Sequence, residues 1–184
     1  MELSSQRPTH DPRAEALRQR YHDVFGGVAV PVPVEAIAED LLGLQVEERW
    51  DLGDCSGMLL PASRQILLNA VEGPRNDPPL RRFRFTIAHE VGHWVCHCLE
   101  GKTADPPAAM CRRRDLQQDT DRVIEREANV FAAELLMPEA AVRAAWDEIG
   151  DLESLAWRFD VSPSAMGWRL YSFGLMGAPA ETTS

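Results

Sequence analysis

The chain reads LRRFRFTIAHEVGHWVCHC over residues 80–98. This stretch has no proline and a single glycine, and it predicts a helix longer than any before it in the chain. Because a helix turns about 100° per residue, His89 and His93 lie about 40° apart on one face, where two imidazoles can bind one metal ion. Glu90 projects to the flank of that face, where a carboxylate can contact a metal-bound water without being a ligand itself.

A hydrolytic zinc centre usually has three protein ligands and leaves the fourth position to water. No histidine follows His97 in the sequence, so we predict that the third ligand is a carboxylate. On a second helix, predicted over residues 120–136, Glu125 shares its side with Asn129 and with small and apolar residues. Such neighbours allow another helix to approach closely, which favours Glu125 as the ligand and Asn129, one turn on, as its hydrogen-bonding support.

Glu127 is the alternative third ligand. It shares its side of the helix with Val130 and Glu134, a pattern typical of a solvent-facing charge row. His97 continues the face of His89 and His93 by one more turn, and we expect it to pack beside the site or support it rather than bind the ion.

The cysteines favour an intracellular protein. The chain has four, Cys55, Cys96, Cys98 and Cys111, too few and too unevenly spaced for the disulfide framework of a small secreted domain. We therefore expect reduced thiols. The N-terminal residues are polar, and no apolar run approaches the roughly 18–20 residues that span a bilayer, so the chain is predicted to be cytoplasmic and to have no membrane partner.

Composition and charge further limit the class of protein and the partners that it can bind. The chain has 184 residues, of which 45% are hydrophobic and 26% charged, an ordinary balance for one globular core. Its formal net charge of −10 disfavours broad attraction to nucleic acid or anionic lipid.

Residues 152–175 nevertheless have the apolar spacing of a helix-turn-helix unit, which raises a DNA-binding regulator as an alternative function. Against a DNA-binding function, residues 147–160 contain several acidic side chains and only one basic residue, Arg158. We therefore prefer a helical subdomain that packs on the catalytic core or docks a substrate.

The chain as a whole predicts an α+β fold. A helix over 12–25, a short helix ending near Gly43 and three short strands within 44–69 precede residue 80, and helices over 139–149, 152–159 and 162–173 close the chain. We expect a small antiparallel sheet of about three strands beside an active-site helix and a ligand helix, with a helical C-terminal region.

Two blocks of sequence carry a family resemblance: RFTIAHEVGH at residues 84–93 and EREANVFAAELLMP at residues 125–138. Both resemble the ImmA/IrrE family of zinc metallopeptidases, and the similarity covers about residues 31–138. It implies a gluzincin-like site with His89, His93 and Glu125 as metal ligands and Glu90 as catalytic base. Zinc is the expected ion, although manganese or iron would accept the same ligands.

Members of this family cleave helix-turn-helix repressors of the Xre type, which relieves repression of mobile-element or stress-response genes. The resemblance therefore implies a protein substrate and peptide-bond hydrolysis. The alternative at the same site is a metal-binding protein that has lost proteolysis and sequesters the repressor. Tyr21, His22 and Tyr171 are all candidates for stabilising the transition-state oxyanion.

On this interpretation the chain divides into four parts. We expect disordered tails at 1–12 and 177–184, a metallopeptidase domain at 13–150, and a C-terminal helical subdomain at 151–176 packed on the core.

Overall fold

The computed structural model describes residues 10–27, 30–71, 79–99, 110–111 and 119–179; within helices and strands, the side chains of residues 79–80, 110–111 and 119–121 are not described. The elements in chain order are α1 (Pro12–Phe25), α2 (Val34–Ala36), the π-helical turn η1 (Ile37–Leu41), β1 (Gln45–Arg49), β2 (Gly57–Leu60), β3 (Gln65–Asn69), α3 (Pro79–His93), the π-helical turn η2 (Trp94–Cys98), β4 (Met110–Cys111), α4 (Asp119–Leu136), α5 (Glu139–Ile149), α6 (Leu152–Phe159) and α7 (Pro163–Ser172). The predicted α+β class is confirmed. Of the tails predicted at 1–12 and 177–184, residues 1–9 and 180–184 lie outside the described residues.

The sheet differs from the prediction in its topology. Its strand order is β1-β3-β2-β4, with β2 antiparallel to β3 and β4 but β1 parallel to β3. The prediction of a purely antiparallel sheet of about three strands was therefore wrong for β1, which pairs in parallel with β3. β3 carries the continuous apolar run Ile66-Leu67-Leu68, all buried, and such a run is typical of a central strand with neighbours on both sides. β3 follows β2 in the chain but lies between β1 and β2 in the sheet.

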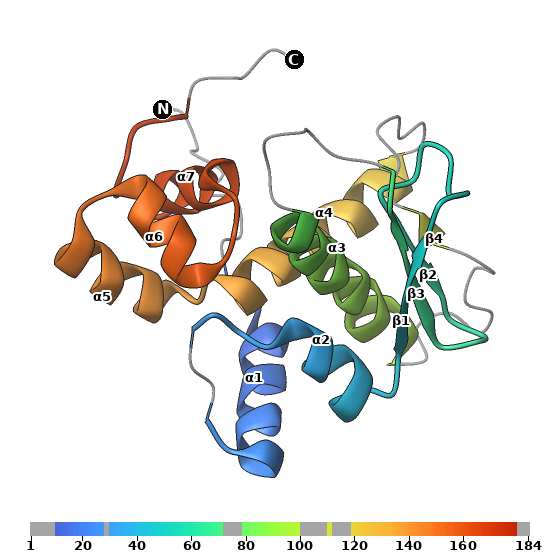
Figure 1. The fold of residues 1–184 in the computed structure, drawn as a ribbon. Coiled ribbons are helices and arrows are strands. Elements are labelled where there is room, and N and C mark those ends of the chain that lie inside the picture. The colour runs from blue at the N-terminus through green and yellow to red at the C-terminus, as the bar shows by residue number, and fades with distance from the viewer. Residues whose placement is uncertain (1–9, 28–29, 72–78, 100–109, 112–118, 180–184) are drawn as a thin grey trace.

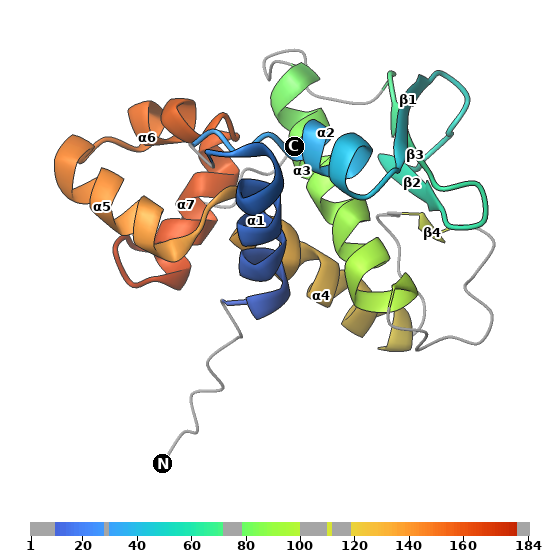
Figure 2. The same ribbon diagram turned by 90° about the horizontal axis from the view of Figure 1, so that it is seen from below.

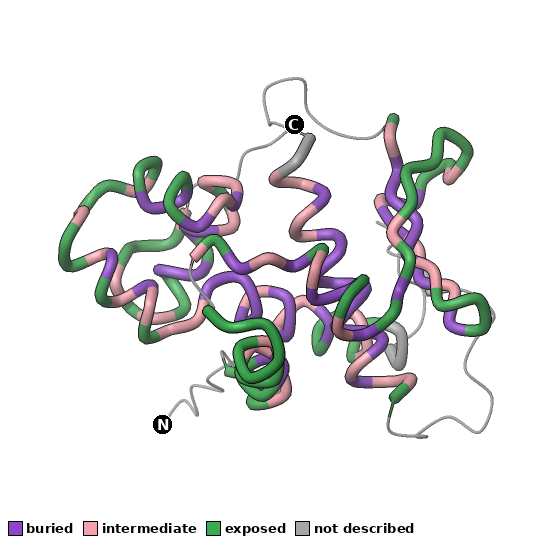
Figure 3. The backbone as a smooth tube through the Cα atoms, turned by 60° about the horizontal axis from the view of Figure 1, so that its bottom comes forward, coloured by how far each residue is buried: buried purple, intermediate pink, exposed green. Residues whose placement is uncertain are grey.

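The elements form a sheet at one end and a helical group at the other, with α3 and α4 between them (Figures 1 and 2). α3 lies against the sheet, α4 packs along α3, and α5, α6 and α7 gather beyond α4. Buried positions concentrate on the inward sides of α3 and α4 and along the sheet, while the outer side of α1 is exposed (Figure 3).

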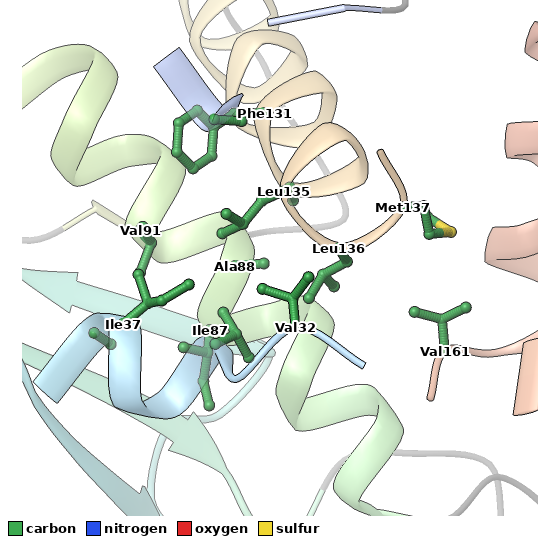
Figure 4. Packing of buried hydrophobic residues seen from close by; sticks show 14 of the residues in the cluster. Val32, Ile37, Ile87, Ala88, Val91, Phe131, Leu135, Leu136, Met137 and Val161 are labelled. Carbon is green, nitrogen blue, oxygen red and sulfur yellow. The ribbon is translucent and has the colours of Figure 1, made fainter. Parts of the chain in front are cut away.

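One apolar core joins these layers. Ile37 of η1, Ile87 of α3 and Leu135 of α4 belong to one buried cluster, part of which is shown in Figure 4, and all three side chains are fully buried. Met137 and Val161 continue the same cluster towards α6, each 1% exposed. The helical C-terminal region thus shares its core with the helices that carry the predicted ligands.

α3 and α4 approach closely at Gly92. A Cβ atom on Gly92 would lie 3.1 Å from both the Cα and the carbonyl oxygen of Ala128, and 3.2 Å from Cδ1 of Phe131. Because backbone atoms cannot give way as a flexible side chain can, the glycine sets the distance between the two helices. Glu125, one turn before Ala128, is thereby brought to the histidine face of α3.

The far side of α4 is also covered, which corrects the interpretation of Glu134. That carboxylate, predicted in a solvent-facing row, is 3% exposed and forms ion pairs with Arg169 of α7 and with Arg18 of α1. Arg169 Nε also donates to the carbonyl of Met137 at 2.9 Å. The prediction failed because α1 and α7 cover this side of α4, and helical periodicity alone cannot show which neighbours a helix will have.

We predict that Arg169→Met destabilises the fold by about 3–5 kcal/mol, because removing one partner leaves a buried charge poorly compensated. The matched control is Arg143→Met, since Arg143 also stacks on Phe173 but pairs with Glu139 on the partly exposed side of α5. That i,i+4 pair contributes about 0.5 kcal/mol at most. Urea unfolding of the three proteins measures both values, and equal losses would contradict a special role for the buried pair.

A second polar contact fixes the corner between α6 and α7 on α3. Asp160 ends α6 in the left-handed conformation, with φ of 51°. Its carboxylate lies 3.3 Å from Nε of Arg81 and 3.3 Å from Nε of Arg84. Arg84 also donates to the carbonyl of Val32 at 2.7 Å. An aspartate at this turn therefore holds the C-terminal helices to the active-site helix, a role that glycine cannot perform.

The cysteines only partly match the expectation of reduced thiols. Cys96 and Cys98 form no disulfide bond, but Cys55 is disulfide-bonded, so the prediction was wrong for Cys55. Spacing excluded a multi-disulfide framework, but it carries no information on a single bond between distant segments. No helix in the described part of the chain is long and apolar enough to cross a membrane.

Candidate metal centre

Three predicted ligand residues meet where α3 and α4 approach each other. Nε2 of His89 lies 3.1 Å from Oε2 of Glu125, and Nε2 of His93 lies 3.0 Å from Oε1 of the same carboxylate. The two Nε2 atoms are 3.0 Å apart. The α-helical spacing brings the two rings together, and the close approach of α4 at Gly92 supplies the carboxylate.

This arrangement fits a single divalent ion. Two ligands of a tetrahedral zinc ion, each about 2.0–2.1 Å from the metal, lie about 3.3 Å from each other. The three distances of 3.0–3.1 Å are close to that value. Two imidazoles and one carboxylate are also the donor set of hydrolytic zinc centres that leave a fourth position open. Among the described residues, this is the group whose ligand atoms all fall within 4.8 Å of one another.

The site is buried and anionic. Both histidine side chains are fully buried, and the Glu125 side chain is 12% exposed. Burial raises the pKa of Glu125, but the hydrogen bonds from His89 and His93 outweigh it and hold the pKa at about 2. An ionised carboxylate between two buried rings is the charge arrangement that attracts a divalent cation.

Asn129, one turn after Glu125 on α4, supports His89. Its Oδ1 lies 3.2 Å from Nδ1 of His89. With the amide oxygen facing the ring, Nδ1 would donate to Asn129 when the lone pair of Nε2 binds an ion. Asn129 was predicted to support Glu125, whereas in the structure its amide oxygen contacts His89.

We predict that Asn129→Ala weakens zinc binding by about 10–100-fold, because outer partners of ligating histidines have effects of this size. Asn129→Asp keeps an acceptor for Nδ1 and should retain most of the affinity. Competition against a chromophoric chelator measures all three proteins. Equal affinities for the alanine variant and the parent protein would show that the contact does not orient His89.

Glu90 lies on the sheet side of α3, apart from the ligand group. Its side chain is fully buried. A Cβ built on Gly57 of β2 would lie 3.1 Å from Oε1 of Glu90, so this carboxylate faces the first residue of that strand. This placement agrees with the expectation of a carboxylate on the flank of the histidine face rather than a fourth ligand.

The remaining candidates lie elsewhere. Glu127, the alternative third ligand, is 47% exposed, and its Oε2 is 3.7 Å from Nε2 of His97. The His97 ring packs against His93 with centroids 5.7 Å apart, and burial lowers the pKa of His97. His97 thus lies beside the group, as predicted, but is not part of it.

The three oxyanion candidates have their own contacts. Tyr21 packs on Phe25 with ring centroids 4.8 Å apart, and Nδ1 of His22 accepts a hydrogen bond from the backbone of Gly27. Tyr171 packs on Trp168 on the exposed side of α7. None of these contacts reaches the ligand group.

Gly57 lies against Glu90 and was not predicted from the sequence. A glycine that opens a strand is a known signal of close backbone approach. The glycine is visible in the sequence, but the sequence does not show that α3 packs against this strand.

The α+β fold and the paired histidines with a carboxylate from a second helix define the class of metallopeptidases built on an HExxH helix. The chain belongs to the Peptidase M78 family, whose model, described as the IrrE N-terminal-like domain, matches residues 59–171. The family resemblance inferred from the two sequence blocks is therefore confirmed.

Two known proteins are similar to this chain, one in sequence and one in fold. The radiation response metalloprotease IrrE of Deinococcus radiodurans is 33% identical over 118 residues, which cover 62% of this chain and 33% of that protein. A solved structure described as a Mycobacterium tuberculosis transcriptional regulator shares the fold, with a TM-score of 0.59 and 19% identity over 86% of this chain and 46% of that one. The chain thus spans about a third of the first relative and just under half of the second.

Proposed function

We propose that this protein is a zinc-dependent endopeptidase that cleaves a helix-turn-helix repressor of the Xre type and so relieves repression. The observation that carries the proposal is the Glu125 carboxylate, which lies 3.0 and 3.1 Å from the two histidine Nε2 atoms. Glu90 is buried on the same helix as the two histidines. Membership of a metallopeptidase family supports the reaction class. His89, His93 and Glu125 would hold the ion.

A zinc ion held there would supply Lewis acidity, lowering the pKa of a coordinated water and polarising the scissile carbonyl. Glu90 accepts a proton from the attacking water and returns it to the leaving nitrogen, so that one carboxylate acts as base and then as acid. Its burial favours this role, because a desolvated carboxylate is a stronger proton acceptor. Asn129 keeps the His89 ring oriented while this happens.

A repressor suits this chain electrostatically. The net charge of −10 attracts basic proteins, and a DNA-binding regulator presents a basic surface. Exposed acidic residues on α5 and α6, including Asp147 and Glu153, extend this charge over the C-terminal helices. We propose that residues 151–176 form a subdomain that packs on the catalytic core and helps to dock the substrate in the cytoplasm.

The test is incubation of the purified protein with an Xre-type regulator encoded beside its gene, if the genome has one there. We expect discrete fragments with the zinc-loaded protein, a loss of cleavage after chelation and its return when zinc is added back. Cleavage that persists after complete metal removal would overturn the proposed mechanism. A stable complex without fragments would point to sequestration, and salt-sensitive binding to duplex DNA without a protein partner would point to a DNA-binding regulator.

A further inference from the structure

The first residue of β2 faces the active-site helix. Gly57 and Leu59 lie on the same face of β2, because alternate residues of a strand point the same way. Leu59 is fully buried in the core. A Cβ on Gly57 would lie only 2.3 Å from Cγ2 of Thr86 and 3.1 Å from Oε1 of Glu90. Thr86 and Glu90 are one turn apart on α3, so both occupy the space that a side chain at position 57 would need.

We propose that Gly57 is a positioning residue for Glu90: the missing side chain on β2 provides the space in which the Glu90 carboxylate lies. The inference rests on the proposed role of Glu90 as proton acceptor. On this proposal β2 helps the reaction by placing the Glu90 carboxylate, whereas the three ligand residues hold the ion.

The backbone conformation does not explain this glycine. Gly57 is absent from the glycines with positive φ, whereas six others, Gly150 among them, have φ between 59° and 75°. A glycine inside a strand also weakens it, since it has no side chain to pack and loses more conformational freedom on folding. The close approach of Thr86 and Glu90 is therefore the reason for a glycine here.

A side chain at position 57 would displace the base. Thr86 is 2% exposed and β-branched, so its methyl group cannot rotate away freely inside a helix. α3 or β2 must then shift, and the Glu90 carboxylate shifts with them. A misplacement of about 1 Å near the reacting groups can cost about 100-fold in rate.

The two contacts can be separated by mutation. Gly57→Ala creates both, and Thr86→Ser removes the methyl group at 2.3 Å while leaving the contact at 3.1 Å to Glu90. The double variant Gly57→Ala/Thr86→Ser therefore isolates the effect on Glu90. Gly177→Ala is the matched control, because a Cβ there meets nothing within 4 Å.

The first readout is the unfolding midpoint of the metal-free protein, which needs no catalytic activity. We expect Gly57→Ala to lower the midpoint strongly and Thr86→Ser to recover most of the loss. In the Thr86→Ser background, Gly57→Ala should cost less stability when Glu90 is also replaced by alanine, because the remaining contact is then absent. An equal cost with and without the Glu90 carboxylate would overturn the inference.

The second readout is the reaction with the neighbouring regulator as substrate. The double variant should bind zinc within about 3-fold of the parent affinity and keep KM, while kcat falls about 10-fold or more. Recovery of both stability and kcat in the double variant would make Gly57 a packing position only. If the parent protein cleaves nothing, the proposed function fails, and the unfolding cycle still decides whether Gly57 sets the place of Glu90.

Discussion

Glu90→Gln is expected to lower the rate of repressor cleavage by at least about 10²–10⁴-fold, the usual contribution of a positioned general base. Glutamine has the shape of glutamate and fits the same buried space against Gly57, but its amide cannot accept the proton. The three residues of the ligand group are unchanged, so zinc content should stay at the parent level. Single-turnover cleavage and metal analysis on the same preparation measure the two quantities together.

The control for this experiment is Glu48→Gln, which neutralises an exposed carboxylate on β1. It should leave both cleavage and zinc content unchanged. If Glu90→Gln and the parent protein cleave equally well, Glu90 is not the base. If Glu90→Gln loses zinc as well as activity, the residue belongs to the metal site itself, and the assignment of its role is wrong.

The features that were predictable from the sequence depend on local signals. α5 and α6 have the bounds expected, and α7 differs by one residue at each end. Asp151 accepts the backbone N–H of Ser154, Ser162 accepts that of Ala165, and Gly150 ends α5 with φ of 64°. Caps of this kind act within a few residues, so they can be read from the chain without its tertiary structure.

The features that were missed depend on distant segments. The parallel pairing of β1 with β3, the disulfide bond of Cys55 and the burial of Glu134 all require knowledge of which elements become neighbours. A helical pattern divides residues among faces, but it does not say that α1 and α7 will cover the face that holds Glu134.

The candidate site falls between these two cases. The spacing of His89 and His93 is a local property of one helix, and the structure brings the rings together as predicted. The preference for Glu125 over Glu127 rested on small and apolar neighbours on its own side of α4. The close approach of α4 to α3 occurs at Ala128, on the adjacent apolar face. Gly57 could not be assigned to the site from the sequence, because nothing near it indicates that β2 begins against Glu90.

Replacing Glu125 by glutamine should weaken zinc binding by more than about 100-fold, because residues that merely support a ligating histidine already account for about 10–100-fold. The expected cause is the loss of the one anionic donor between two buried imidazoles, where the pKa of Glu125 is held at about 2 and the group is fully ionised at neutral pH. Glutamine keeps the size of the side chain, so the packing of α4 on α3 at Gly92 should persist.

Glu127→Gln is the matched comparison, since it makes the same substitution two residues away on the same helix, at a carboxylate that is 47% exposed. Zinc that binds only the folded state raises the unfolding midpoint by mass action, so a titration of the midpoint against free zinc reports affinity without any substrate. The parent protein and Glu127→Gln should show the same zinc-dependent rise, and Glu125→Gln should show almost none at the same zinc concentration. The reverse pattern would make Glu127 the third ligand, and it would mean that α4 turns its other side towards His89 and His93 when the ion binds.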